Sequence, residues 1–362
     1  MVTGLYRTIT DGYTSNSPAD DTAGLTNMFL TANSTGGAII LEPKTYNIAT
    51  ALPTLKGTVN VIGYGSSSLI QYTGPNPGSA VDLFSVDGTG LTSITTYATY
   101  NDFTVKVQDN PDNTAKRLQN VTCIKFRNLA NINITNILGR GGLTGIELDG
   151  VLSSTATRIN SNGNYYGVLV HNTAGDVSSC NEVTLIHPSV GQNWQGGIKW
   201  QDGAPNIVGG NFEGNGISPI EGANTGFGLK VIRDSNQNGL MPNGLNLYGG
   251  YFEVNHGTAD IWIQHNEVAN IAWFIEGSNF NRVGTSFCTN NIRLDNSQNA
   301  YTGLTVFRTT HNDAGGYVHS VNNKYGAYNF TGTGTQAKNV VWLPSYQNQG
   351  IEVPNFPFTS WN

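Results

Sequence analysis

The segment "GIKW" at residues 197–200 recurs in altered form along the chain and decides the fold. Related segments are "CIKF", "GIEL", "GVLV", "GLKV", "DIWI" and "NIRL", which begin at residues 123, 145, 167, 228, 260 and 291. In each segment the second and fourth residues are apolar, and the third is often charged or large: Glu147, Lys199, Lys230, Trp262 and Arg293. This alternation is typical of a strand with one face buried and one face exposed.

A second set of strand-like segments lies between these. It comprises "NINITN" (131–136), "TATRIN" (155–160), "EVTLIHP" (182–188), "PNIVGG" (205–210), "GLNLYGG" (244–250) and "NIAWFIEG" (270–277). Each repeat therefore supplies at least two strands, and its variable length indicates a loop, such as residues 233–244. A propeller needs more even spacing, and a sandwich does not repeat equivalent strands in this way. The pattern predicts an all-β, single-stranded, right-handed parallel β-helix of roughly ten coils.

The composition agrees with short strands joined by tight corners. Charged residues make up 12% of the 362 residues, and there are 45 glycines. The net charge of −6 without a basic block argues against nucleic acid as a partner. No apolar run is long enough to span a membrane, and the first residues lack the pattern of a signal peptide. We interpret Cys123, Cys180 and Cys288 as buried small apolar residues, without a disulfide or zinc site.

The N-terminal stretch from 20 to 65 carries a family resemblance. Its "DDTA" motif precedes a helix expected over about Thr22–Ala32, and Leu25, Met28 and Phe29 give that helix an apolar face. "GGAIILEPKTYNI" then predicts the first strands, and "VNVIGYG" predicts the first coils. The stretch resembles the start of pectate-lyase-like β-helix proteins, in particular bacteriophage tailspikes. The helix is expected to cover the open end of the solenoid.

The resemblance implies a homotrimer in the virion tail that binds, and often cuts, a bacterial surface polysaccharide outside the cell after host lysis. We expect a cap at 1–60, the β-helix at 61–320, and a C-terminal cap or inter-subunit segment at 321–362. No virion-attachment domain is visible before residue 20. The Asn-Thr-Asp, Gly-His-Gly and Arg-Ile-Lys motifs of the polygalacturonase branch do not occur, so that branch's catalytic residues are not carried over.

Two similar heptapeptides, "GGNFEGN" (209–215) and "GGYFEVN" (249–255), suggest the catalytic residues. Counting from the strand markers places Glu213 and Glu253 on neighbouring coils, with Phe212 and Phe252 pointing inward. Two carboxylates at a one-coil spacing of about 5 Å match the separation in retaining glycosidases, and side-chain lean could widen it to the inverting range. The alternative is a pair of solvated glutamates with a structural role at a corner.

Further residues in neighbouring columns are expected to bind the glycan, because sugar rings stack on aromatic faces. They are Trp194, Tyr165, Tyr248, Tyr251, His256 and Trp262, whereas Trp200 is expected in the core. Asp202 is either an ion-pair partner of Arg233 or a further catalytic acid. Arg233, Lys230 and Lys199 could also neutralise a uronate, as a lyase requires.

The leading hypothesis is a tailspike-like glycoside hydrolase that uses Glu213 and Glu253, with Asp202 as a further candidate. The alternatives are a receptor-binding β-helix without chemistry and a polysaccharide lyase. We expect no metal and no other cofactor, because the histidines show no ligand spacing. They are His171, His187, His311 and His319.

Overall fold

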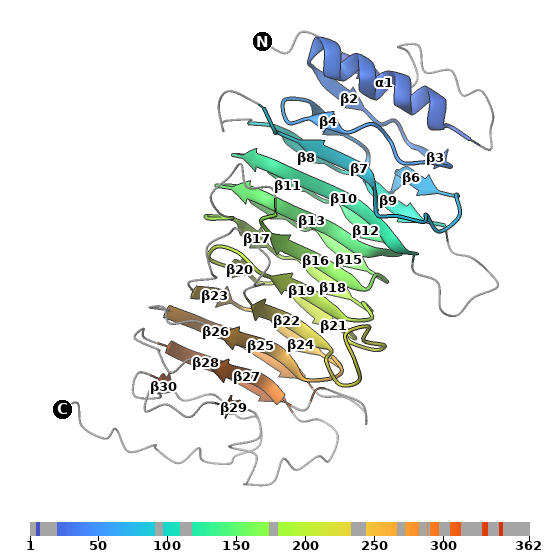
Figure 1. Ribbon diagram of the computed structural model, residues 1–362. Coiled ribbons are helices and arrows are strands. Elements are labelled where there is room, and N and C mark those ends of the chain that lie inside the picture. The colour runs from blue at the N-terminus through green and yellow to red at the C-terminus, as the bar shows by residue number, and fades with distance from the viewer. Residues whose placement is uncertain are drawn as a thin grey trace.

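The computed structural model is a stack of coils in which strands equivalent by sequence lie directly above one another (Figure 1). It describes residues 5–7, 20–90, 97–108, 118–173, 180–232, 244–265, 272–281, 288, 290–296, 305–312, 328–331 and 340–342. All strand pairings among these residues are parallel. Since parallel crossovers are right-handed, the fold is the predicted right-handed parallel β-helix.

Each complete coil contributes one strand to each of three faces, which is one strand more than the minimum of two expected from the sequence. The first face contains β2 (Ala38–Ile40), β5 (Asn60–Ile62), β8 (Thr99–Asn101), β11 (Asn133–Thr135), β14 (Thr155–Thr157), β17 (Thr184–Ile186), β20 (Asn206–Val208) and β23 (Gly244–Tyr248). The second face contains β3 (Lys44–Ile48), β6 (Ser68–Tyr72), β9 (Thr104–Val107), β12 (Leu138–Arg140), β15 (Asn160–Asn162), β18 (Ser189–Gly191), β21 (Asn211–Glu213) and β24 (Tyr251–Glu253). The long strands β26 (Ala272–Asn281) and β28 (Thr305–Asn312) run through both faces.

The third face is a separate sheet of ten strands, which matches the expected number of coils. It contains β4 (Leu55–Lys56), β7 (Val81–Asp87), β10 (Leu118–Ala130), β13 (Gly142–Leu152), β16 (Tyr166–His171), β19 (Gly196–Trp200), β22 (Phe227–Ile232), β25 (Ala259–His265), β27 (Asn290–Asn296) and β29 (Tyr328–Thr331). "GIKW" and the six segments related to it all lie on this face. Their second residues are in register from Ile124 through Ile198 to Ile292, as predicted.

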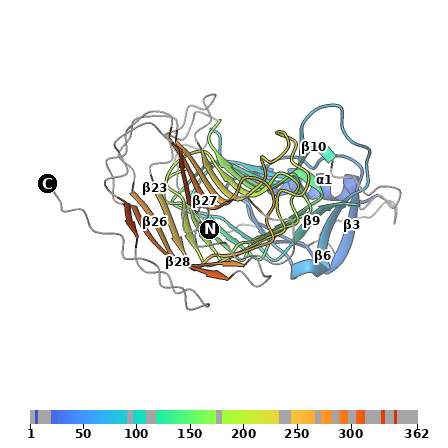
Figure 2. The ribbon, with the colours of Figure 1, turned by 90° about the horizontal axis from the view of Figure 1, so that it is seen from below.

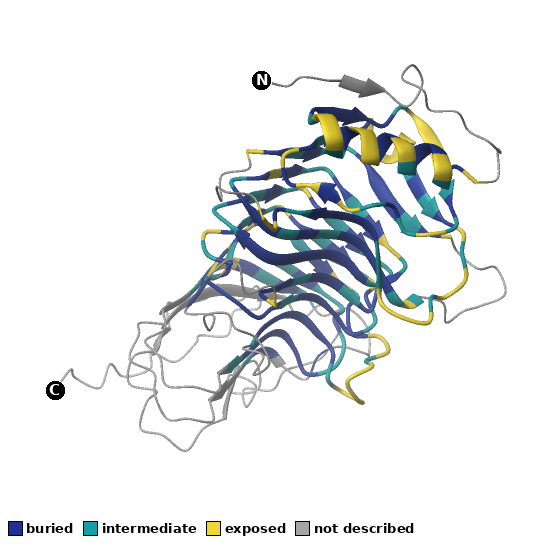
Figure 3. Ribbon diagram, turned by 45° about the horizontal axis from the view of Figure 1, so that its top comes forward, coloured by how far each residue is buried: buried dark blue, intermediate teal, exposed yellow. Residues whose placement is uncertain are grey.

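The ends of the stack differ. At one end α1 (Thr22–Thr35) covers the first coils with Leu25, Met28 and Phe29 buried, as predicted, and its outer side is exposed (Figure 3). The carboxylate of Asp21, at the start of the helix, makes no capping hydrogen bond. It accepts hydrogen bonds from the Nζ of Lys44 at 2.7 Å and from the backbone N–H of Asn47 at 2.9 Å. Beside α1, β1 (Leu5–Arg7) pairs with β2. At the other end β29 and β30 (Val340–Trp342) extend two faces beyond residue 320.

The three faces enclose the interior of the stack (Figure 2). One continuous apolar core fills this interior. Phe212, Phe252 and Phe280 stack along it on successive coils. Trp200 is fully buried, as predicted, and the three cysteines are buried and form no disulfide. Among the described residues, none of the helices has the length and apolarity needed to cross a membrane.

A ladder of buried asparagines forms the corner between the second and third faces. Asn164, Asn193, Asn215 and Asn255 follow one another on four successive coils. The Nδ2 of Asn193 donates to the Oδ1 of Asn215, and the Nδ2 of Asn215 donates to the Oδ1 of Asn255, both at 2.9 Å. Each amide also donates to a backbone carbonyl. The final Asn of each heptapeptide is therefore scaffold, because it satisfies the buried polar groups of the corner.

Glycine at the start of the third-face segments has a steric cause. A Cβ at Gly167 would lie 2.4 Å from the carbonyl oxygen of Gly197, and one at Gly197 would lie 2.5 Å from that of Gly228. The coils approach too closely there for a side chain.

Candidate functional site

The two glutamates of the heptapeptides lie next to each other on the second face. Glu213 pairs with Glu253 in the parallel register of β21 and β24, as predicted, and Asn281 follows Glu253 on the next coil. Neighbouring strands are about 4.8 Å apart, so the backbones of the two glutamates are separated by one strand spacing. Phe212 and Phe252 are fully buried, whereas Glu213 is exposed and Glu253 is half-buried. Both glutamates therefore point outward on adjacent coils.

Polar groups hold these carboxylates in place. The Nδ2 of Asn211 donates to the Oε2 of Glu213 at 3.2 Å. The Nδ2 of Asn281 donates both to the Oε1 of Glu253 at 3.0 Å and to the hydroxyl of Tyr251 at 2.9 Å. Burial raises the pKa of Tyr251, and the negative charges of Glu253 and Glu213 add to that rise. The phenol thus stays a neutral hydrogen-bonding group beside the paired carboxylates.

The predicted aromatic column follows the asparagine ladder, since each of its members comes directly after a ladder asparagine. Trp194 and His256 are half-buried, and burial lowers the pKa of His256. Tyr165 does not fit the predicted sugar-binding role, because only 3% of it is exposed. Its ring packs edge-on against Trp194, with centroids 5.3 Å apart, and its hydroxyl accepts a hydrogen bond from Gln119.

Tyr248 lies on the first face, in register with Val208 and Glu276 rather than with the glutamate pair. It is 41% exposed and packs against Phe274, with ring centroids 5.3 Å apart. It is accessible to a ligand, but it lies across the corner from Glu253.

Trp262 and Lys230 occupy the outward column of the third face, where Lys199, Lys230, Trp262 and Arg293 are in register. The Nζ of Lys230 lies 3.8 Å from the centroid of the Trp262 ring, and Arg293 lies at 5.3 Å. Trp262 points outward as predicted, but cationic side chains pack on it and leave 9% of it exposed.

Asp202 does not have the environment of a catalytic acid. It is fully buried, and its Oδ2 accepts a hydrogen bond from the backbone N–H of Cys180 at 2.7 Å. The indole of Trp200 donates to its carbonyl oxygen. These contacts stabilise the turn after β19, so the site is built without Asp202. Arg233, its predicted ion-pair partner, and most of the loop 233–244 lie outside the described residues.

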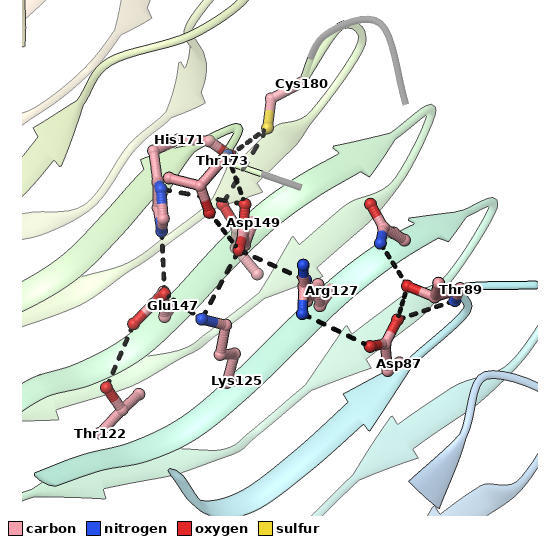
Figure 4. Close-up of polar contacts among 12 residues, drawn as sticks. Asp87, Thr89, Thr122, Lys125, Arg127, Glu147, Asp149, His171, Thr173 and Cys180 are labelled. Atoms are coloured by element: carbon pink, nitrogen blue, oxygen red, sulfur yellow. Dashed lines mark hydrogen bonds and ion pairs between the residues drawn. The ribbon is translucent and has the colours of Figure 1, made fainter. Parts of the chain in front are cut away.

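A charged network on the third face was missed by the sequence analysis (Figure 4). The Nζ of Lys125 lies 2.8 Å from the Oε1 of Glu147 and 3.5 Å from the Oδ2 of Asp149. The Nε2 of His171 lies 2.9 Å from the same Oε1 of Glu147. Asp87, Arg127, Asp149 and His171 are in register on successive coils, so stacking the second outward position of each strand would have revealed them.

The electrostatics of this network favour the ionised form of Glu147. Burial by itself would raise the pKa of Glu147, but His171 and Lys125 outweigh burial and lower that pKa to about 2. Glu147, Asp149 and His171 each present a potential metal ligand, within 4.8 Å of one another. The ammonium group of Lys125 already contacts both carboxylates, so the network balances its charge with its own side chains. We therefore assign it a structural role.

Comparisons with known proteins place the fold. No family model and no curated protein sequence matches the chain. Among solved structures, ORF18 of Geobacillus virus E2 matches with a TM-score of 0.58 and 15% identity, covering 95% of this chain and 62% of its own. The enzymatically active domain of tailspike protein 2 from bacteriophage CBA120 matches with a TM-score of 0.60 and 15% identity, covering 95% and 47%. The tailspike gp42 of an Acinetobacter phage gives 0.54 and 10%, covering 96% and 64%.

The chain thus spans between about half and two thirds of these three phage proteins. Its resemblance to the tailspike β-helices, which the sequence analysis predicted, is confirmed at the level of the fold. The fold by itself does not assign an activity.

Proposed function

We propose that this chain is a tailspike-like depolymerase domain that binds and hydrolyses a bacterial surface polysaccharide, with Glu213 and Glu253 as the catalytic pair. The observation that carries the proposal is the in-register, outward placement of the two glutamates on adjacent coils. The likeness to phage tailspikes supports the polysaccharide as substrate class. It also supports action in the virion tail, outside the cell.

In this proposal one carboxyl group protonates the glycosidic oxygen of the leaving sugar. The other carboxylate acts on the anomeric carbon, either directly or by activating a water molecule. Asn211 and Asn281 hold the two carboxylates, and Tyr251 offers a hydroxyl and a ring edge to the sugar. The one-strand separation is near the roughly 5–5.5 Å of retaining enzymes.

The test is a pair of isosteric variants, Glu213→Gln and Glu253→Gln, assayed on a panel of purified capsules and lipopolysaccharides. Release of reducing ends should fall at least ~100-fold in each variant while glycan binding persists, since the amide cannot transfer the proton or attack. Azide rescue of Glu213→Ala or Glu253→Ala would identify the nucleophile of a retaining enzyme. Glu182→Gln, an exposed carboxylate bonded to Ser153, is the matched control.

Each rival function predicts a different result. Wild-type protein that binds a glycan but releases no reducing ends would indicate a receptor-binding β-helix. Products that absorb near ~235 nm would indicate a lyase, because elimination leaves an unsaturated uronate. Normal turnover by both glutamine variants would contradict the site assignment.

We also propose that the chain forms a homotrimer and that the first face contributes to the contact between subunits. The outward positions of β8, β11, β14, β17 and β20 carry no charged residue. They are Thr99, Asn101, Asn133, Thr135, Thr155, Thr157, Thr184, Ile186, Asn206 and Val208. Ile186→Arg should convert a trimer into monomers in analytical ultracentrifugation, and a wild-type monomer would contradict the proposal.

A further inference from the structure

On the third face, the carboxylate of a loop glutamate contacts two lysines and a tyrosine that lie on strands. The loop 214–226 joins β21 to β22 and begins directly after Glu213. In this loop the Oε1 of Glu221 lies 2.8 Å from the Nζ of Lys199, and its Oε2 lies 3.8 Å from the Nζ of Lys230. The hydroxyl of Tyr166 also donates to this carboxylate. Three donors on three successive coils thus converge on one carboxylate group.

The donors are fixed, but the anion is not part of the sheet. Tyr166, Lys199 and Lys230 lie on β16, β19 and β22, and Lys230 is further held against the Trp262 ring at 3.8 Å. Glu221 belongs to a loop in which residues 217, 218 and 220–224 are exposed. Lys199 and Tyr166 lower the pKa of Glu221 despite its partial burial.

The backbone of the loop does not depend on this carboxylate. The Oε1 of Gln195, a fully buried residue, accepts the backbone N–H of Glu221 at 2.8 Å. Its Nε2 donates to the carbonyl oxygen and the hydroxyl of Thr225, both at 3.1 Å. The Glu221 side chain can therefore rotate out while Gln195 keeps the loop in place.

The neighbouring charged network shows the contrast. There Lys125 lies on β10, and Glu147 and Asp149 lie on β13. Both the cation and the anions are therefore held by strands of the sheet. In the Glu221 site, by comparison, only the anion is exchangeable. Two lysines and a phenol that meet one carboxylate on a loop form a site that an external carboxylate can occupy.

We propose that Tyr166, Lys199 and Lys230 form a subsite for the carboxylate of an acidic sugar, and that Glu221 is a tethered occupant which this sugar displaces. The inference rests on the proposed function for its polysaccharide ligand, and it names an acidic glycan as the substrate class. The loop that carries Glu221 starts directly after Glu213, so the subsite on the third face and the glutamate pair on the second face flank the same corner.

The test measures binding of sodium glucuronate by NMR titration or calorimetry, with glucose as the neutral probe. Removal of the tethered anion in Glu221→Gln should tighten glucuronate binding at least ~10-fold over wild type, because charge-assisted hydrogen bonds then go to the external carboxylate. Glucose binding should not change. Adding Lys199→Met and Lys230→Met to Glu221→Gln should abolish the gain, whereas Lys56→Met, an exposed lysine near α1, should preserve it.

The outcome that overturns the inference is a folded Glu221→Gln protein, checked by its unchanged thermal unfolding, that binds glucuronate no better than wild type. The same holds if Glu182→Gln, the control carboxylate, gives an equal gain. Since the readout is binding of a monosaccharide, it is independent of cleavage at Glu213 and Glu253. Cleavage of a glycan without glucuronate binding would contradict only the anion subsite. Glucuronate binding without cleavage would contradict only the proposed hydrolysis.

Discussion

The rings of Phe212 and Phe252 stack inside the β-helix with centroids 4.4 Å apart and planes at 10°, and this contact fixes the register of the two glutamates outside it. In a strand, neighbouring residues point to opposite faces. A stacked pair of inward rings therefore sets Glu213 and Glu253 side by side on the surface. The same two strands, β21 and β24, thus contribute to stability through their inward side chains and to the candidate chemistry through their outward side chains.

Truncating the central ring should destabilise the fold. Phe252 lies between Phe212 and Phe280, whose ring centroid is 5.1 Å away, so Phe252→Ala leaves a cavity between two rings. We expect a loss of about 3–5 kcal/mol in the free energy of unfolding by denaturant titration. Tyr97→Ala, at a residue 74% exposed, should change it by less than about 0.5 kcal/mol. Equal effects of the two variants would contradict the stacking argument.

The asparagine ladder should be equally sensitive. Asn215→Ala removes the Nδ2 donor to Asn255 and the Oδ1 acceptor for Asn193, and leaves buried polar groups unpaired. Each such group costs about 1–3 kcal/mol, so the melting temperature should fall clearly in calorimetry. Asn76→Ala, at an exposed loop position outside the asparagine ladder, is the control. A neutral Asn215→Ala variant would show that water replaces the amide.

Close approach of the coils predicts a steric penalty at Gly145. A Cβ there would lie 1.9 Å from the Oγ of Ser161 and 2.6 Å from the Nδ2 of Asn164. Gly145→Ala should therefore cost about 1–3 kcal/mol through forced displacement of the corner. Gly78→Ala is the matched control, since a Cβ there meets nothing within 4 Å. Thermal unfolding should show a lower melting temperature for Gly145→Ala and an almost unchanged one for Gly78→Ala.

The third-face network predicts a loss of stability in acid. The folded pKa of Glu147 is about 2, below its ordinary value of 4.5, so its contribution is present above pH 4.5. That contribution is lost as the pH falls from about 4.5 to about 2, and amounts to something on the order of 3 kcal/mol. Glu147→Gln should unfold more readily at neutral pH and show a flatter dependence across this window. Parallel curves for wild type and variant would contradict the prediction.

The repeated strands made the fold and the glutamate pair predictable, because register in a solenoid can be counted from sequence markers. The count followed the third residue of each segment and the column that contains Asp202, and it left out the outward position between them. Asp149 and His171 occupy that position and were missed. Tyr165 and Asp202 were wrongly predicted as site residues, because both are buried. A column in the sequence predicts which way a side chain points, but not which other residues pack over that side chain. The loop that carries Glu221 has no periodicity, so only the structure brings it to Lys199.

Asn281 should act on the proposed reaction as a positioning residue. Its amide bonds both Glu253 and Tyr251, so Asn281→Ala leaves the carboxylate free to rotate while the core below remains intact. We expect kcat to fall roughly 10- to 100-fold with KM nearly unchanged, because misplacement of a reacting group raises the barrier more than it weakens binding. The pH–rate profile should also shift, which a merely structural effect would not produce. Asn246→Ala, at an exposed position on the first face, should retain wild-type kinetics. If Asn281→Ala keeps full kcat on a glycan that Glu253→Gln no longer cleaves, then Glu253 does not need this amide for its orientation, and the role of Asn281 is confined to the surface of the coil.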